Sequence, residues 1–168
     1  MKFSVWAVFA LVWAGQPLLA LAVRPAPQRA VEGIVSKVDD AGSLWLTPPG
    51  QSPVHVRLGN IEPPESCQSW GEEARRALAE LALHKSATLR IASRDASGQA
   101  RGSVQVEGID LATKMVEEGH AWSIRTHWDR GPLVKQELMA KALHRGLHGV
   151  GDAVRPADFR RSHGPCAQ

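Results

Sequence analysis

Three side chains suited to phosphate chemistry lie close together in the stretch HVRLGNIEPPE, residues 55–65. The planar guanidinium group of Arg57 can donate to two phosphate oxygens at once. The carboxylates of Glu62 and Glu65 can bind a cation or accept a proton from water. An arginine beside two acids is therefore compatible with a site that binds or hydrolyses a phosphate ester.

A strand, a turn and a helix are expected to position these groups. Apolar and polar residues alternate from Val54 to Leu58, which is the period of a half-buried strand that presents Arg57 on its outward face. The prolines at positions 63 and 64 exclude a helix, so both glutamates lie in a turn. From about Ser69 the apolar residues follow a helical period, with one face made of Ala74, Ala77, Leu78, Leu81 and Ala82.

The rest of the chain predicts a small, mainly β fold of the α+β class. Further strands are expected at 31–38, 43–47, 87–92 and 101–106, and further helices at 109–118 and 132–145. The apolar residues of the last helix are Leu133, Leu138, Met139 and Leu143. Five strands interleaved with three helices fit a Greek-key barrel.

Length and composition fit one globular domain, because the chain has 168 residues, of which 43% are hydrophobic and 22% charged. Residues 1–22 combine one lysine, an apolar run and small residues at its end, which predicts a signal peptide cleaved near Ala22. An uncleaved anchor is the alternative. We expect a flexible arm at 23–30, the folded domain at 31–149 and a tail at 150–168. The mature protein is then exported, periplasmic or secreted, a monomer, and without a membrane span.

The only two cysteines are Cys67 and Cys166. In an oxidising compartment such a pair predicts a disulfide that ties the acidic turn to the tail, with two free thiols as the alternative. Removing the leader deletes Lys2 and lowers the formal net charge from +3 to +2. This charge is too small to indicate a nucleic-acid partner. We interpret the basic side chains of the tail and of one loop as solvated surface: Arg155, Arg160, Arg161 and His163, and Arg125, His127 and Arg130.

The stretch RLGNIEPPE resembles the signature R-L-x-x-I-D-x-P-E of the thermonuclease (staphylococcal nuclease-like) family, with Glu62 in place of aspartate. The rest of the chain, from about Val31 to Leu147, follows in the family's order. This resemblance implies a five-stranded oligonucleotide/oligosaccharide-binding (OB) barrel and calcium-dependent hydrolysis of phosphodiesters in DNA or RNA. It also implies that Arg57 contacts phosphate, that Glu65 is the general base, and that Glu62 and the backbone carbonyl of Pro63 bind calcium.

Two positions depart from the family pattern. The family's V-x-D-G-D-T turn here reads VDDAGS, so Asp40 matches its first aspartate, a weak ligand candidate, while Gly42 replaces a calcium aspartate. The second phosphate arginine of a D-x-x-G-R turn is replaced by Gln99. Arg101 lies two residues further on the same strand face and is a candidate substitute, as Asp39 and Asp40 are for the missing metal ligand. Calcium binding is therefore expected to be weakened or absent.

Other candidate ligand groups are aromatic or imidazole side chains. The chain has no tyrosine, so base stacking would need Trp45, Trp122, Trp128 or a histidine. His144 and His148 are spaced i, i+4 and would need His120 or His127 to bind zinc, but solvated helix-end histidines are the favoured interpretation.

The sequence favours a thermonuclease-like domain that acts on or binds nucleic acid, with weak or lost hydrolysis. Retained Arg57 and Glu65 support this, whereas Gly42 and Gln99 argue against full activity. The alternative is a non-catalytic exported OB-fold module that binds a protein or an envelope component.

The first testable prediction concerns export. The exported protein should begin near Val23 and contain no free thiol, because Cys67 and Cys166 have only each other within the chain. Intact mass, measured after alkylation with and without prior reduction, tests both points. Two alkylatable thiols under non-reducing, denaturing conditions would contradict the bridge.

Overall fold

The computed structural model describes residues 30–126 and 128–166, and the predicted signal peptide lies outside them. Its strands are β1 (Ala30–Asp40), β2 (Ser43–Thr47), β3 (Val54–Leu58), β4 (Ile61–Glu62), β5 (Ser86–Arg94), β6 (Ala100–Val106), β7 (Ile109–Asp110) and β8 (Trp122–Ser123). The helices are α1 (Gly71–Ala82), α2 (Leu111–Glu117), α3 (Val134–Ala142), a 3₁₀ turn (Gly146–His148) and α4 (Pro156–His163).

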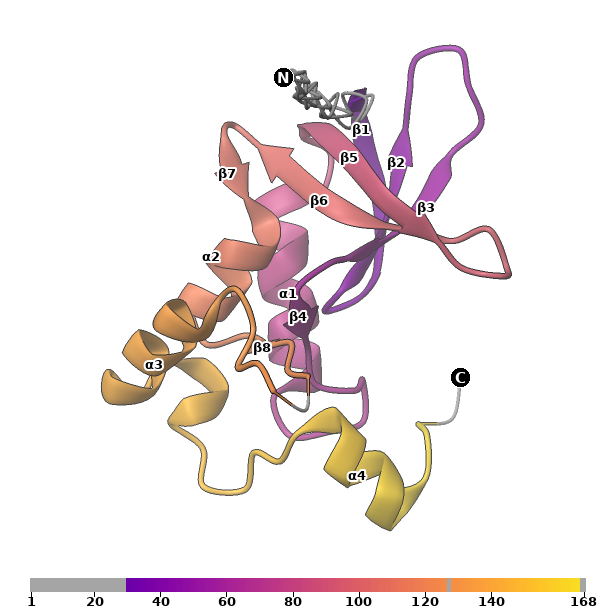
Figure 1. The fold of residues 1–168 in the computed structure, drawn as a ribbon. Coiled ribbons are helices and arrows are strands. Elements are labelled where there is room, and N and C mark those ends of the chain that lie inside the picture. The colour runs from indigo at the N-terminus through magenta and orange to yellow at the C-terminus, as the bar shows by residue number, and fades with distance from the viewer. Residues whose placement is uncertain (1–29, 127, 167–168) are drawn as a thin grey trace, which may run out of the picture.

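Five strands form a closed barrel, which confirms the predicted fold class. The sheet order is β3-β2-β1-β5-β6-β7, and parallel pairing between β3 and β6 closes the ring of the first five strands. The short strand β7 pairs with β6 only. Inward side chains alternate along these strands and build the core, with fully buried Val35, Leu44, Leu46, Val56, Leu89 and Val104. The barrel strands gather at the upper end of the molecule, whereas the short strands β4 and β8 lie lower down among the helices (Figure 1).

Helices α1 and α2 cover the barrel core as their periodicity predicts. Ala74, Leu78 and Ala82 of α1 are completely buried, and so are Met115 and Val116 of α2. Asp110 caps α2 by accepting a hydrogen bond from the backbone N–H of Thr113 at 2.8 Å. The apolar faces of both helices therefore pack on the core.

Most of the predicted apolar face of α3 is on the outside, although Leu133 at its N-cap packs against the core. Leu138, Met139 and Leu143 are more than half exposed, whereas the buried positions of the helix are Glu137 and Ala140. Glu137 is only 1% exposed because several cations and a backbone N–H satisfy its carboxylate. These partners are Arg125 at 2.8 Å, Lys141 at 2.6 Å, Arg155 at 3.2 Å and the N–H of Ser123 at 3.1 Å. Sequence periodicity cannot identify a core position occupied by a neutralised charge.

The C-terminal tail folds back onto the acidic turn. Its helix α4, which the sequence did not predict, is followed by Cys166, which forms a disulfide with Cys67 across a Cα–Cα distance of 5.7 Å. The predicted disulfide is therefore present. Gln68, buried in the turn, also donates to the carbonyl oxygen of Val154 at 3.1 Å. Figure 1 shows α4 at the lower edge of the molecule, where the chain turns back upward at its C-terminal end.

Among the described residues, no helix is both long enough and apolar enough to cross a membrane.

Replacing Glu137 should destabilise the fold. Burial alone would raise the pKa of Glu137, but Lys141, Arg155 and Arg125 outweigh burial and lower it. Glu137→Gln should reduce the free energy of unfolding near neutral pH by about 3–5 kcal/mol, because it removes the buried charge on which Lys141, Arg125 and Arg155 converge.

The acid dependence has a defined sign. Because the folded-state pKa is lowered, the contribution of Glu137 is complete above its ordinary value of 4.5 and disappears as the pH falls through the folded-state pKa. Urea unfolding at several pH values should show that the free energies of unfolding of the wild type and of Glu137→Gln converge in acid. Glu73→Gln, at a half-exposed pair with Arg76, is the control and should change stability by less than about 0.5 kcal/mol. An equally small effect of Glu137→Gln would contradict the prediction.

Candidate functional site

Arg57 lies at the centre of three adjoining hollows on the outside of the barrel. One hollow, of about 230 Å³, is lined by Asp40, the acidic turn and Cys166. The second, of about 180 Å³, contains Glu62, Glu65 and Arg101. The third, of about 140 Å³, lies against the β5–β6 turn with Gln99. The structure therefore brings Arg57, both acids, Pro63 and Arg101 together, as the sequence predicts.

Local backbone contacts fix the acidic turn. Glu62 belongs to β4 and pairs with Trp122 of β8 in a two-stranded ladder. The backbone N–H of Glu65 donates to the side-chain oxygen of Gln68 at 2.7 Å. Helix α1 begins at Gly71 directly against this turn, where a Cβ atom would overlap the carbonyl oxygen of Glu65. Both carboxylates are thus held on rigid backbone close to the end of β3.

Arginines from the tail neutralise both acids. Arg155 donates to Glu62 at 2.6 Å and to Glu137 at 3.2 Å, and its guanidinium lies 5.8 Å from the centre of the Trp122 ring. Arg160 of α4 donates to Glu65. The interpretation of the tail as solvated surface is therefore wrong for Arg155, whose side chain is 19% exposed. Arg160 and Arg125 are 48% and 42% exposed, so they are surface residues that also form ion pairs, and Arg161 is 78% exposed.

The residues at the predicted metal position do not fit a calcium ion. An oxygen of Asp40 accepts the backbone N–H of Gly42 at 2.7 Å, while Glu62 and Glu65 are each paired with an arginine. A Cβ atom at Gly42 would lie 2.8 Å from Cγ of Pro63, so no larger side chain enters there without displacing the proline ring. Calcium is held by several carboxylate and carbonyl oxygens, and these carboxylates are already engaged. Within the described parts of the chain, no three acids, histidines or cysteines form a cluster suited to a metal.

Gln99 closes the turn between β5 and β6 without entering the hollow that holds the acids. Asp95 accepts hydrogen bonds from the backbone N–H groups of Ser97 at 2.9 Å and of Gln99 at 3.0 Å. These bonds and the hydroxyl of Ser97 lower the pKa of Asp95. The side chain of Gln99 contacts the ring of His55 at 3.2 Å. Arg101, its predicted substitute, pairs with Arg57 across the parallel β3–β6 ladder and lines two of the three hollows around Arg57.

The aromatic candidates have separate environments. Trp45 stacks on His55 with ring centres 4.5 Å apart, and its indole N–H donates to Asp39 at 2.6 Å. Burial alone would raise the pKa of Asp39, but hydrogen bonds from Lys37 and Trp45 lower it. The carboxylate of Asp39, a candidate replacement metal ligand, therefore contacts Trp45, His55 and Lys37. Trp122 is a core residue with 4% exposure, and Trp128 is 91% exposed.

The histidines proposed for zinc have different surroundings. His144 lies in the exposed segment after α3, whereas His148 belongs to the 3₁₀ turn and packs edge-on against Trp122. Burial lowers the pKa of both His148 and His120. His120 accepts a hydrogen bond from the indole of Trp70 at 3.1 Å. His127 lies outside the described residues. The weak zinc hypothesis thus gains no geometric support.

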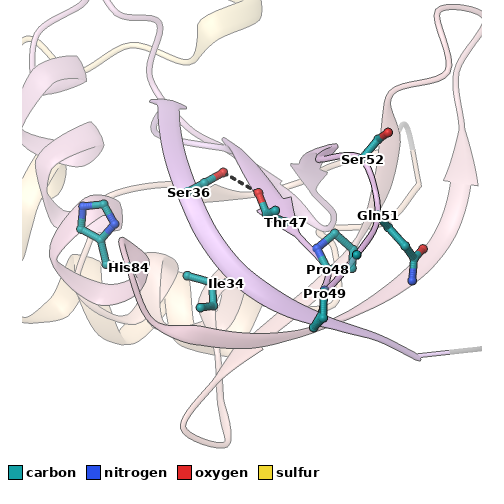
Figure 2. A pocket seen from close by; sticks show the side chains of 9 residues that line it. Ile34, Ser36, Thr47, Pro48, Pro49, Gln51, Ser52 and His84 are labelled. Atoms are coloured by element: carbon teal, nitrogen blue, oxygen red, sulfur yellow. Dashed lines mark hydrogen bonds between the residues drawn. The ribbon is translucent and has the colours of Figure 1, made fainter.

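A larger hollow, of about 820 Å³, lies between β1, the β2–β3 loop and His84 (Figure 2). The hydroxyl group of Thr47 donates a hydrogen bond to that of Ser36 at 3.0 Å. Apolar surface comes from Pro48, Pro49 and Ile34. Its lining contains no carboxylate, arginine or lysine. The chemistry of the chain is therefore concentrated around Arg57.

The sequence pattern did not place the two tail arginines, Arg155 and Arg160, at the site. Arg155 and Arg160 are 93 and 95 residues from the acids that they bind. The signal that could have located them was the predicted disulfide, which already placed Cys166 next to the acidic turn.

Known proteins similar to this chain include several named as nucleases. The family model described as "Staphylococcal nuclease homologue" matches residues 55–147. The chain is 28% identical over 137 residues to the "Probable staphylococcal-like nuclease CAN3" of Oryza sativa subsp. japonica, covering 79% of this chain and 36% of the rice protein. It is 24% identical over 127 residues to an "Uncharacterized endonuclease" of Haemophilus influenzae, covering 76% and 71%. It is also 29% identical over 165 residues to "Protein ParB" of Escherichia coli, covering 91% and 92%. The chain thus spans little more than a third of the rice relative.

Proposed function

Because the chain belongs to the staphylococcal nuclease homologue family, we propose that it binds nucleic acid through the phosphodiester backbone at Arg57, with hydrolysis that is weak or lost. The observation that carries this proposal is the position of Arg57 in the hollow that also contains Glu62, Glu65 and Arg101. A guanidinium on a rigid strand is a suitable donor to phosphate oxygens. Nothing in the site distinguishes DNA from RNA, so the proposal covers both.

Weak hydrolysis follows from what the site lacks. Phosphoryl transfer needs stabilisation of the charge that develops on the phosphoryl oxygens. Gly42 contributes no carboxylate and Gln99 contributes no charge. Losing one preorganised donor costs about 10²–10³ in rate, and a transition-state arginine can contribute about 10³–10⁵. Calcium would supply charge to such a reaction, but the acids here are already paired with Arg155 and Arg160.

The remaining groups have defined roles in this proposal. Arg57 orients the phosphodiester, and Glu65 is the group that would accept a proton from water once Arg160 is displaced. Glu62, in its pair with Arg155, positions the tail against the site. We further propose that the protein is exported and monomeric. The apolar leader at residues 1–22 and the Cys67–Cys166 disulfide support export.

A second candidate function is a protein-binding module without catalysis. The exposed apolar residues Leu138, Met139 and Leu143 on α3 favour it, because an exposed apolar cluster is a common feature of docking surfaces. The binding experiment below distinguishes the two functions.

Arg57→Ala should weaken binding to a single-stranded oligonucleotide. We expect a loss of about tenfold or more, since charge-assisted hydrogen bonds contribute about 1.5–3 kcal/mol. Fluorescence anisotropy over a series of salt concentrations measures it, and affinity should fall with salt because phosphate contacts release counterions. Arg75→Ala, on the exposed side of α1, is the control. Negligible binding by both wild type and Arg57→Ala at low salt would favour the protein-binding function.

Restoring the missing groups should raise calcium-dependent cleavage. Gly42→Asp must be combined with Pro63→Ala, because the new Cβ would otherwise meet the proline ring at 2.8 Å. The triple variant that also carries Gln99→Arg should cleave more than Gly42→Asp with Pro63→Ala, and more than Gln99→Arg alone. The reason is that the new carboxylate and the new arginine stabilise the same transition-state charge. Single-stranded DNA digestion measures this, with Pro63→Ala as the control. High wild-type activity that Glu65→Gln abolishes and the triple change does not improve would contradict the proposed weak hydrolysis.

A further inference from the structure

The hollow of about 180 Å³ beside Arg57 collects three guanidinium groups from distant parts of the chain. Arg57 belongs to β3, Arg101 is its neighbour on β6, and Arg160 comes from α4. The acids in the lining are Glu62 and Glu65, and Glu62 is already neutralised by Arg155 at 2.6 Å from outside the lining. The hollow therefore carries an excess of positive charge.

Two of these arginines lie side by side without a balancing acid at hydrogen-bond distance. Arg57 and Arg101 are direct partners in the parallel β3–β6 ladder. Within residues 30–126 and 128–166, no side chain accepts a hydrogen bond from either guanidinium. Like charges at paired strand positions repel each other. An anion bound between them would remove this repulsion, so the pair favours an anionic ligand.

Contacts at both ends hold Arg160 at the same hollow. Before α4, Arg155 is fixed by Glu62, Glu137 and the face of Trp122. After α4, Cys166 is bonded to Cys67, which follows Glu65 by two residues. A helix anchored at both ends directs Arg160 toward the acidic turn with little loss of freedom on binding a ligand.

The present partner of Arg160 can be exchanged. Arg160 is 48% exposed and Glu65 is 25% exposed. Ion pairs that are this open to water contribute little to stability. A phosphodiester entering the hollow offers two non-bridging oxygens that share one negative charge, and these match the guanidinium fork as the carboxylate does. Moving Arg160 from Glu65 to phosphate therefore requires no change in the fold.

We propose that Arg160 is a phosphate-binding residue, supplied by the C-terminal segment, that holds a phosphodiester together with Arg57 and Arg101. This inference rests on the proposed function and names the groups that complete its binding site. Arg160 then supplies the second cationic fork that Gln99 does not provide. Binding also releases Glu65, because Arg160 cannot donate fully to the carboxylate and to phosphate at the same time. The ligand class is a nucleic-acid phosphodiester.

The test compares neighbouring arginines of α4 in the full, oxidised protein. Arg161→Ala is the matched control, since Arg161 is 78% exposed and its partner is Asp158 on the same helix. Binding of a fluorescent single-stranded oligonucleotide should weaken about tenfold for Arg160→Ala and less than about threefold for Arg161→Ala. The slope of log affinity against log salt should fall in magnitude by about 0.7 for Arg160→Ala, as for one lost single-strand phosphate contact. Arg160→Lys should recover part of the affinity.

A second measurement separates a phosphate contact from a purely structural role. Glu65→Gln should tighten binding in the wild-type background, because it releases Arg160 for the phosphate. The same change should tighten binding less when Arg160 is already alanine, so the two changes are non-additive. A structural role of Arg160 would give equal effects of Glu65→Gln in both backgrounds.

The outcomes distinguish this inference from the function on which it rests. If Arg57→Ala weakens binding while Arg160→Ala binds as well as or better than wild type, Arg160 only masks Glu65 and the inference is wrong. If wild type does not bind the oligonucleotide at low salt, the proposed function itself fails. A loss with Arg160→Ala, no comparable loss with Arg161→Ala and the expected non-additivity would support both.

Discussion

The buried carboxylate of Glu137 is the interaction on which the rest of the site depends. A buried charge is tolerated only when opposite charges and hydrogen bonds surround it, and here they come from α3, the loop after β8 and the tail. One of its partners, Arg155, also reaches Glu62 in the acidic turn. Arg155 is also the N-cap residue of α4, so this ion pair links a core position on α3 to the start of α4.

The disulfide fixes the other end of the same segment. Cys67 lies between Glu65 and the start of α1, and Cys166 lies just beyond α4. A bridge across 99 residues restricts the unfolded chain strongly, by about 4–5 kcal/mol in the chain-entropy account. Its local consequence is as important, because it keeps Arg160 beside Glu65 in a region that otherwise has few apolar contacts.

The site thereby differs from one organised around a cation. In a calcium site, carboxylate and carbonyl oxygens converge on the metal. Here tail arginines occupy the acids, while Arg57 and Arg101 remain open to an anion in the same hollow. The charge at the centre is carried by side chains of the protein itself. This charge distribution is the basis for the proposal that the site binds phosphate but hydrolyses it weakly.

The sequence by itself determined the barrel and the corner that holds Arg57, Glu62 and Glu65. These features are local, since a strand period of two, a proline turn and a helical period each depend on residues close together in the chain. It also predicted the disulfide, because the chain has only two cysteines and an N-terminal stretch that predicts export. The departures at Gly42 and Gln99 came from the resemblance to the family's motifs.

Only the tertiary structure decided the electrostatics of the site. The sequence placed Leu138 and Met139 on the apolar face of α3, but the structure buries Glu137, because cations distant in sequence neutralise it. The sequence predicts that the basic tail is solvated surface, yet Arg155 and Arg160 pair with acids more than ninety residues away. The periodicity of a segment indicates which of its faces is buried, but it does not depend on charge pairing with distant segments. The partners of the acids therefore follow only from the tertiary structure.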